Sequence, residues 1–242
     1  MYLAAVFSNG HITTGRHHGE AFSKLSCEDQ EADLISGHLN DDGTFTTEMT
    51  CVHKEIILIR HAESMWNVNK TDNLDSNLTP LGITQSHKIA NYIKKHIDCR
   101  DIIGYTSPFD RCLLTSMPIR RQTGIKFIVR SEISEVADQF PDSGIEVICR
   151  NKQYFDFDWQ HYSTTTFHKE SCKNLIDRLN TFINLLPNRS IVITHAGIVQ
   201  VLIEMALGVK VSSIPNWGNF IDNASITHIK DGTVVCLAKN IA

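Results

Sequence analysis

The sequence predicts an α/β protein: a three-layer α/β/α domain with a mainly parallel sheet, preceded by a small β-rich appendage. Two patterns lead to this fold class. Short apolar runs typical of buried strands alternate with amphipathic helical patterns over residues 52–242. Residues 1–51 instead contain glycines and turn signals between short segments. We therefore expect a boundary near residue 52, between an appendage whose role the sequence does not indicate and one larger domain.

The individual elements follow from local signals. In the appendage, strands are expected at residues 3–7, 11–14 and 44–47, with a helix around residues 19–25. In the domain, strands are expected at residues 56–59, 101–106, 125–129, 190–194, 225–229 and 233–237, and helices at residues 80–97, 108–116, 169–186 and 197–207. Thr79 should cap the first of these helices, with Pro80 in its first turn. Pro118 should kink or end the second.

Composition excludes several classes of protein. Hydrophobic residues make up 42% and charged residues 21% of the 242 residues, as in a globular chain, so wholesale disorder is excluded. The net charge of −4 provides no basic excess for nucleic acid, and no apolar stretch is long enough to span a bilayer. The seven cysteines are scattered without a Cys-x-x-Cys pair, and the first residues lack the basic flank of a signal peptide. These features favour reduced thiols in a cytoplasmic protein.

Two histidines each follow an expected buried strand, His61 after the first strand of the domain and His195 after the fourth. In open α/β sheets, ligands bind beyond the carboxyl ends of the strands, so the two imidazoles are expected to share a pocket. Arg60 precedes the first histidine, and Arg111 lies early in the helix after the next strand. Guanidinium groups bind the oxygens of a phosphoryl dianion, and a neutral imidazole nitrogen can attack phosphorus. The sequence therefore predicts a phosphoryl-transfer site.

Four segments of the domain occur in the order found in a known family. They are Arg60-His61-Ala62-Glu63-Ser64 followed by Asn67, Leu78-Thr79-Pro80-Leu81-Gly82 followed by Gln85, Ser107-Pro108 followed by Arg111 and Thr115, and Val192-Ile193-Thr194-His195-Ala196-Gly197. Together they resemble the motifs of the histidine phosphatase superfamily, whose fold is shared with the cofactor-dependent phosphoglycerate mutases. Each segment alone is a weak signal, but four in the right order are a strong one. The resemblance covers residues 55–237.

The resemblance implies roles for the four residues of the predicted phosphoryl site. His61 would be the nucleophile that becomes phosphohistidine, while Arg60, Arg111 and His195 would hold the phosphoryl oxygens. Neighbouring guanidiniums lower the pKa of an imidazole, which is expected to keep the nucleophile neutral at pH 7. Because the arginines supply the positive charge that phosphoryl transfer requires, no metal ion or other cofactor is expected.

The resemblance also implies three supporting groups. Asn67 would donate a hydrogen bond near the nucleophile, and the backbone N–H of Ala196 would bind the substrate. The family usually takes the proton for the leaving group from a glutamate in the loop after the third strand, which is Glu135 here, with Glu132 as a competitor. The same group could later activate water. The chain departs from the family in lacking the usual glycine and aromatic residue just after this acid.

The chain lacks two features of the mutases that it resembles, an Arg-His-Tyr-Gly run after the acid and a long basic insertion before the second histidine. A hydrolase is therefore expected: a histidine acid phosphatase-type phosphomonoesterase acting on a small phosphorylated substrate. Two alternatives stay open, a phosphohistidine-protein phosphatase and a catalytically silent phosphate-binding module. The sequence does not identify the substrate, and it leaves open whether the chain forms a homo-oligomer.

Overall fold

The computed structural model describes residues 54–136, 144–148, 164–206, 221–231 and 233–241, together with four short strands within the first 53 residues. The strands are β1 (Leu3–Phe7), β2 (Ile12–Gly15), β3 (Leu34–Leu39), β4 (Phe45–Thr46), β5 (Glu55–Arg60), β6 (Ile103–Thr106), β7 (Phe127–Val129), β8 (Ile145–Ile148), β9 (Thr164–Phe167), β10 (Arg189–Thr194), β11 (Ser225–Lys230) and β12 (Thr233–Asn240). The helices are α2 (Pro80–His96), α3 (Asp110–Thr123), α4 (Cys172–Leu185) and α5 (Ala196–Ala206), with a 3₁₀ turn η2 (Ser131–Ile133).

The centre of the sheet is parallel. β10 lies between β5 and β6, and β7 follows β6, with every one of these pairs parallel. β11 joins the other side of β5 in antiparallel orientation and forms a hairpin with β12. The predicted mainly parallel sheet is confirmed for this part of the molecule. Because Thr194 pairs with Arg60, β5 and β10 end at the same level of the sheet, which brings the residues that follow them together.

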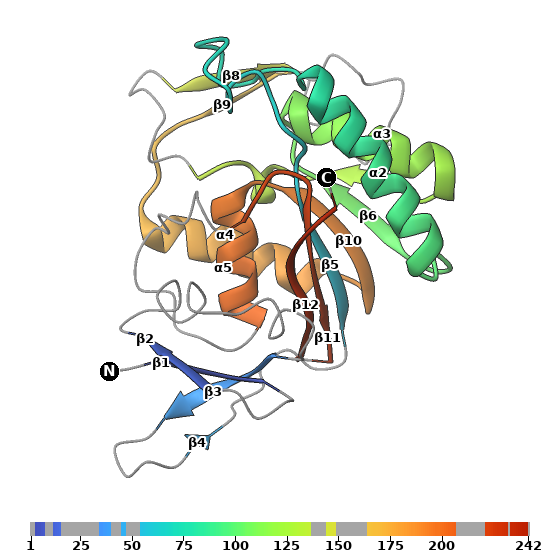
Figure 1. The fold of residues 1–242 in the computed structure, drawn as a ribbon. Helices are drawn as coiled ribbons and strands as arrows, with labels where there is room; N and C mark the ends of the chain where they lie inside the picture. Colours follow the sequence, from blue (N-terminus) through green and yellow to red (C-terminus); the bar gives the residue numbers. More distant parts are fainter. Residues whose placement is uncertain are drawn as a thin grey trace.

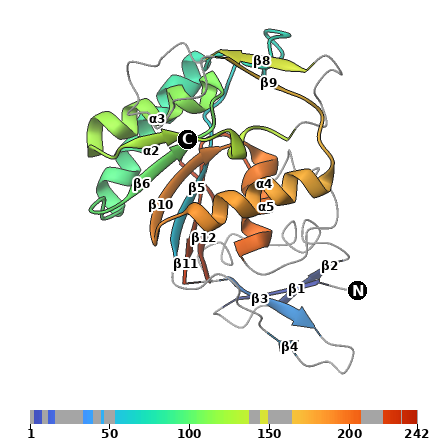
Figure 2. The same cartoon turned by 180° about the vertical axis from the view of Figure 1, so that it is seen from behind.

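Helices cover both faces of the sheet, α2 and α3 on one face and α4 and α5 on the other (Figures 1 and 2). The alternation of side chains along β5 explains this arrangement. Ile56 and Leu58 belong to the buried cluster that includes the apolar face of α4, and Ile57 and Ile59 belong to the cluster that includes the apolar stripe of α2. The predicted three-layer architecture is confirmed. Among the described residues, no helix has both the length and the apolar character needed to cross a membrane.

The strands of the first 53 residues continue the central sheet instead of forming a separate one. β3 pairs with β12, through Leu34 and Val234, and also with β1, which pairs with β2. β1, β2 and β4 lie where strands were expected, whereas β3 was not predicted, because Gly37 interrupts its apolar pattern. The expected helix at residues 19–25 lies outside the described residues. A domain boundary near residue 52 stays a prediction.

Helix α3 differs from the prediction at both ends. It begins at Asp110 rather than at Pro108, and it continues through Pro118 to Thr123, where Gly124 ends it with a φ of 76°. Proline lacks the N–H that would bond the carbonyl of Leu114 and costs about 3 kcal/mol in a helix interior. The helix survives because its face is packed into the core on both sides of the proline, including Leu113 and Ile119. Tertiary packing here outweighs local propensity.

Candidate active site

The pairing of β5 with β10 places the two histidines side by side. The N–H of His61 donates to the carbonyl of Thr194 at 2.9 Å, which continues the sheet beyond the last paired residues. The imidazole rings of His61 and His195 lie 5.2 Å apart, inclined at 65°, and both residues are buried. The structure therefore brings the two sequence-predicted histidines into one cluster at the carboxyl edge of the sheet.

The ring of His61 has a defined orientation. Nδ1 lies 2.8 Å from the carbonyl of Ala62, which assigns the proton to Nδ1 and leaves a lone pair on Nε2. Nε2 accepts from Nε of Arg111 at 3.2 Å. Burial, reinforced by Arg111, His195 and Arg60, holds the pKa of His61 well below its usual value. The ring is therefore neutral at pH 7, as a nucleophile requires.

Arg111 connects the members of the cluster. Besides donating to His61, it contacts Nδ1 of His195 through Nη2 at 3.1 Å, and its Nη1 donates to the carbonyl of Leu74. Its guanidinium lies 4.6 Å from the centre of the Phe109 ring, which precedes α3. The side chain is almost fully buried. A guanidinium fixed between two imidazoles is suited to bind an anion placed over both rings.

His195 faces one hydroxyl and one carboxylate. Its Nε2 lies 2.8 Å from Oγ of Ser107, and its Nδ1 lies 3.2 Å from Oε2 of Glu135. Burial lowers the pKa of His195 to about 4; Glu135 opposes this shift and Arg111 reinforces it. His195 is therefore also neutral at pH 7, and the positive charge of the cluster comes from the arginines.

Glu135 rather than Glu132 reaches the cluster. Oε2 of Glu135 lies 3.4 Å from Arg111 and 3.2 Å from His195, whereas the carboxylate of Glu132 accepts a hydrogen bond from Ser131. Burial alone would raise the pKa of Glu135, but His195 and Arg111 outweigh it and lower that pKa to about 2. Without substrate, Glu135 is therefore a carboxylate that serves as the counter-ion of Arg111.

Three further predicted residues lie around the cluster. Arg60 ends β5 and donates to the carbonyl of Ile221. Burial lowers the pKa of its guanidinium from the usual, very basic value. Asn67 is exposed, and its Oδ1 accepts from the backbone and hydroxyl of Ser64, so it closes the turn after the nucleophile. Ala196 is the first residue of α5, directly after His195. Substrate contacts of Asn67 and Ala196 stay predictions.

The second family-like segment acts as a support for the first. The hydroxyl of Thr79 donates to the carboxylate of Glu63 at 2.6 Å and caps α2 by accepting from the N–H of Gly82. The side chain of Gln85 accepts from the N–H of Glu63. A Cβ on Gly82 would lie 2.0 Å from the carbonyl oxygen of Glu63. The start of α2 can therefore approach the loop after His61 only because residue 82 is glycine.

Sequence reasoning did not single out several residues that hold the site. Thr115 accepts from the N–H of Ala62 at 3.0 Å, and Ser107 contacts His195. Both lie in the third family-like segment, so the resemblance could have identified them. Asn223 donates to the carbonyl of His61 at 3.0 Å and to Oδ1 of Asn67 at 3.2 Å. No sequence pattern marks Asn223, since it follows no strand and belongs to no segment that resembles the family.

Two imidazoles and one carboxylate could in principle hold a metal ion. One ligand atom from each of His61, Glu135 and His195 lies within 4.8 Å of the others. Arg111, however, donates to His61 and contacts both of the other groups from the same space. A cation placed there would meet a buried guanidinium, so the arrangement suits an anion better than a metal ion.

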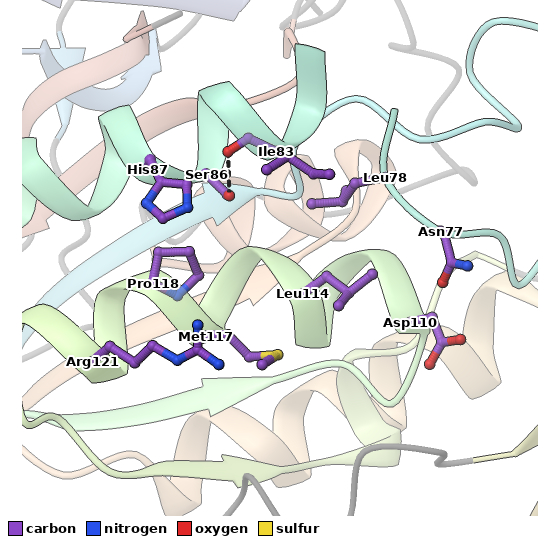
Figure 3. A pocket seen from close by; sticks show the side chains of 10 residues that line it. All are labelled: Asn77, Leu78, Ile83, Ser86, His87, Asp110, Leu114, Met117, Pro118 and Arg121. Carbon is purple, nitrogen blue, oxygen red and sulfur yellow. Dashed lines mark hydrogen bonds between the residues drawn. The ribbon is translucent and has the colours of Figure 1, made fainter. Parts of the chain in front are cut away.

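A separate cavity of about 580 Å³ lies between α2 and α3 (Figure 3). Its wall is mixed, with apolar side chains such as Leu114 and Met117 beside the polar side chains of His87 and Arg121. None of the sequence-predicted site residues lines it. The cluster of His61, His195, Arg111 and Glu135 is therefore distinct from this cavity, which lies along the helix that carries Arg111.

Comparison with known proteins shows the family and the fold. Residues 56–238 match the family model of the histidine phosphatase superfamily (branch 1). Phosphoserine phosphatase 1 of Hydrogenobacter thermophilus is 28% identical over 203 residues, covering 77% of this chain and 92% of that protein. The alpha-ribazole phosphatase from Shigella flexneri has a similar fold, with a TM-score of 0.55 at 20% identity over 77% of this chain and 96% of that one. A mycobacterial protein named Mycobacterial hydrolase 1 gives a TM-score of 0.50 at 19% identity over 72% and 90% of the two chains.

Proposed function

The chain belongs to the histidine phosphatase superfamily, and on this premise we propose that it hydrolyses phosphomonoesters without a metal ion, through a phosphohistidine on His61. The observation that best supports this is the state of the His61 ring. Its Nδ1 faces a carbonyl at 2.8 Å, and its Nε2 is directed at the guanidinium of Arg111. A phosphoryl dianion that takes over this guanidinium donor would release the Nε2 lone pair and place its phosphorus next to it.

In the first step, Nε2 of His61 attacks phosphorus, a P–N bond forms and the P–O bond to the leaving group breaks. Arg111, Arg60 and His195 hold the three oxygens that do not react, and the guanidiniums stabilise the negative charge of the transition state. Two permanent positive charges against a dianionic phosphoryl group balance without a metal ion. The departing oxygen takes a proton from Glu135.

Glu135 must gain this proton when substrate binds. In the free enzyme its pKa is about 2, because His195 and Arg111 outweigh the effect of burial. A substrate dianion would compete for both partners and add negative charge beside the carboxylate, and both changes raise its pKa. In the second step Glu135, again a carboxylate, takes a proton from water as the water attacks phosphohistidine. This step releases inorganic phosphate and restores neutral His61.

Small phosphomonoesters are the proposed substrates. Phosphoserine and alpha-ribazole phosphate are the first to test, because proteins named for them are similar to this chain. Glu135 within contact of the cluster favours an ester over a phosphohistidine-protein substrate, since an alkoxide needs an acid more than an imidazole does. We also propose a cytoplasmic location, supported by the four described cysteines, Cys99, Cys112, Cys172 and Cys236, which are all free thiols.

The test is to trap the phosphoenzyme. Native protein incubated with radiolabelled p-nitrophenyl phosphate and quenched in alkali should carry a base-stable, acid-labile phosphate, and His61→Ala should lose both labelling and turnover. His87→Ala, an exposed histidine on α2, is the control and should keep both. Phosphate binding without labelling or turnover would instead indicate the silent binding module and reject the proposed mechanism.

A further inference from the structure

The described part of the loop that carries Glu135 contains little regular structure of its own. Up to Val136 it consists of the single 3₁₀ turn η2 followed by Ser134, Glu135 and Val136. One carbonyl of the turn, that of Ile133, accepts from the hydroxyl of Thr194 at 2.6 Å. On the same side of the sheet, helix α4 packs against η2. Three further carbonyls of the loop, those of Glu132, Ser134 and Glu135, are bound by one side chain of that helix.

That side chain is Arg178, and its five N–H groups make five contacts. Nη1 donates to the carbonyls of Glu132 and Ser134, the latter at 3.2 Å, and Nη2 donates to the carbonyl of Glu135 at 3.4 Å. The two remaining donors bind both carboxylate oxygens of Glu170, with Nε to Oε2 at 2.8 Å. The Arg178 and Glu170 side chains are 19% and 13% exposed.

We propose that Arg178, oriented by Glu170, is a positioning residue for the acid step: it fixes the loop so that the carboxyl of Glu135 stays within reach of the leaving-group oxygen. This inference rests on the proposed function, in which Glu135 is the acid. The planar fork of the guanidinium is required, because only arginine can donate to three carbonyls and to a bidentate carboxylate at once. Lysine at this position would retain the charge but leave some of these acceptors without a donor.

A positioning role differs from a purely structural one in what it does to the kinetics. The groups that hold the phosphoryl oxygens do not contact Arg178, so loss of its side chain should leave binding of the phosphoryl group nearly unchanged. p-Nitrophenolate departs without protonation, whereas an alkoxide needs the acid. The value of kcat/KM reports the step in which the leaving group departs, before water attacks phosphohistidine. Loss of Arg178 should therefore lower kcat/KM for β-glycerol phosphate by about 10-fold or more, against less than about 3-fold for p-nitrophenyl phosphate.

Arg189 provides a matched control. It also pairs with a glutamate, Glu55, at 2.7 Å and donates to two carbonyls, those of Arg100 and Asp98, at 2.7 and 2.9 Å. This clamp lies at the amino end of β10, the opposite end from His195. Arg189→Gln should lose stability as Arg178→Gln does, but it should not change the ratio of kcat/KM between the two substrates.

The experiment measures kcat and KM on both substrates for Arg178→Gln, Arg178→Lys, Glu170→Gln, Glu135→Gln and the double variant Arg178→Gln/Glu135→Gln. Three results together support the inference. Arg178→Gln loses kcat/KM selectively on β-glycerol phosphate, Glu170→Gln shows a smaller selective loss, and the double variant loses no more than Glu135→Gln alone. If Arg178→Gln does not fold, Arg178→Lys and Glu170→Gln carry the same test. Equal losses on both substrates, or additive losses in the double variant, would overturn it.

The same data separate this inference from the proposed function. If His61 is not phosphorylated, the proposed function itself is wrong. If His61 is phosphorylated but Glu135→Gln shows no selectivity between the substrates, Glu135 is not the acid and the role of Arg178 is rejected with it. If Glu135→Gln is selective and Arg178→Gln is not, only the positioning role is rejected.

Discussion

The two halves of the active-site cluster are held in different ways. His61 and His195 follow adjacent parallel strands, and the register of β5 against β10 sets their ring separation of 5.2 Å. Glu135 lies in a loop outside the sheet, held by the buried side chains of Ile133 and Val136 and by hydrogen bonds from the hydroxyl of Thr194 and the guanidinium of Arg178. The nucleophile half is thus fixed by the sheet, and the acid half by side-chain contacts.

This difference indicates how each half should fail. A single substitution does not shift the register of a buried parallel strand pair, so changes in the nucleophile half act on the reacting groups themselves and affect every substrate. A change in the acid half leaves the phosphoryl-binding groups in place. It should affect substrates in proportion to their need for a proton.

The largest effect is expected for Arg111→Ala, in the nucleophile half. This change removes the contacts to His61 and His195 and one of the two guanidiniums that offset the substrate's charge. We expect kcat/KM to fall about 1,000-fold or more on both p-nitrophenyl phosphate and β-glycerol phosphate. Arg121→Ala, an exposed arginine at the far end of α3, should be close to native. A loss confined to β-glycerol phosphate would place Arg111 in the acid half instead.

Glu135→Gln changes the acid half and, unlike Arg111→Ala, should affect the two substrates unequally. The amide keeps the shape of the side chain but cannot donate a proton to the leaving group. We expect kcat/KM on β-glycerol phosphate, which reports the departure of the leaving group, to fall about 100-fold, with a change of only a few-fold on p-nitrophenyl phosphate. Glu132→Gln, whose carboxylate contacts Ser131, is the matched control and should show no such selectivity. If the two variants exchanged behaviour, Glu132 would be the acid.

The same division explains what the sequence could predict. Residues at the ends of buried strands are identifiable from apolar runs, so His61, His195 and Arg60 could be placed before any coordinates. The acid could only be narrowed to two candidates, because Glu132 and Glu135 both follow β7 within a few residues. Arg178 and Asn223 act on partners more than forty positions away through backbone carbonyls. Such contacts leave no periodicity or motif in the sequence.

The errors in the fold have a related cause. Proline at position 118 was expected to disturb α3, but packing on both sides of it decides the outcome. Strand β3 was not expected because Gly37 interrupts its apolar pattern, and its partners, β1 and β12, lie at opposite ends of the chain. Local signals predicted the elements whose stability is local, and they failed where distant contacts determine the structure.

Gly82→Ala tests the packing that supports the nucleophile half. The added Cβ would lie 2.0 Å from the carbonyl oxygen of Glu63, so α2 and the loop after His61 must separate. We expect a loss of about 2–3 kcal/mol in the free energy of unfolding, together with reduced turnover of both substrates. Urea denaturation and steady-state kinetics measure these effects. Lys88→Ala, exposed on the same helix, should show neither; native stability of Gly82→Ala would mean that the support is not needed.

The pH dependence of stability separates the two halves by the range in which each responds. Burial lowers the pKa of His195 from 6.5 to about 4, with Glu135 opposing and Arg111 reinforcing the shift. As pH falls from 6.5 to 4, the unfolded chain binds a proton at this position that the folded protein does not. Folding stability should therefore fall by up to about 1.4 kcal/mol per pH unit from this group.

Glu135 behaves differently, because its pKa is lowered from 4.5 to about 2 as His195 and Arg111 outweigh burial. Its stabilising contribution is complete above pH 4.5 and is lost as pH falls towards 2. Urea denaturation at several pH values should show His195→Asn with a shallower slope than native protein between pH 6.5 and 4, and Glu135→Gln with a shallower slope only below 4.5. His87→Asn should follow the native curve. If His195→Asn also followed the native curve, His195 would already be protonated in the folded protein. The positive charge of the nucleophile half could then no longer be assigned to the arginines alone.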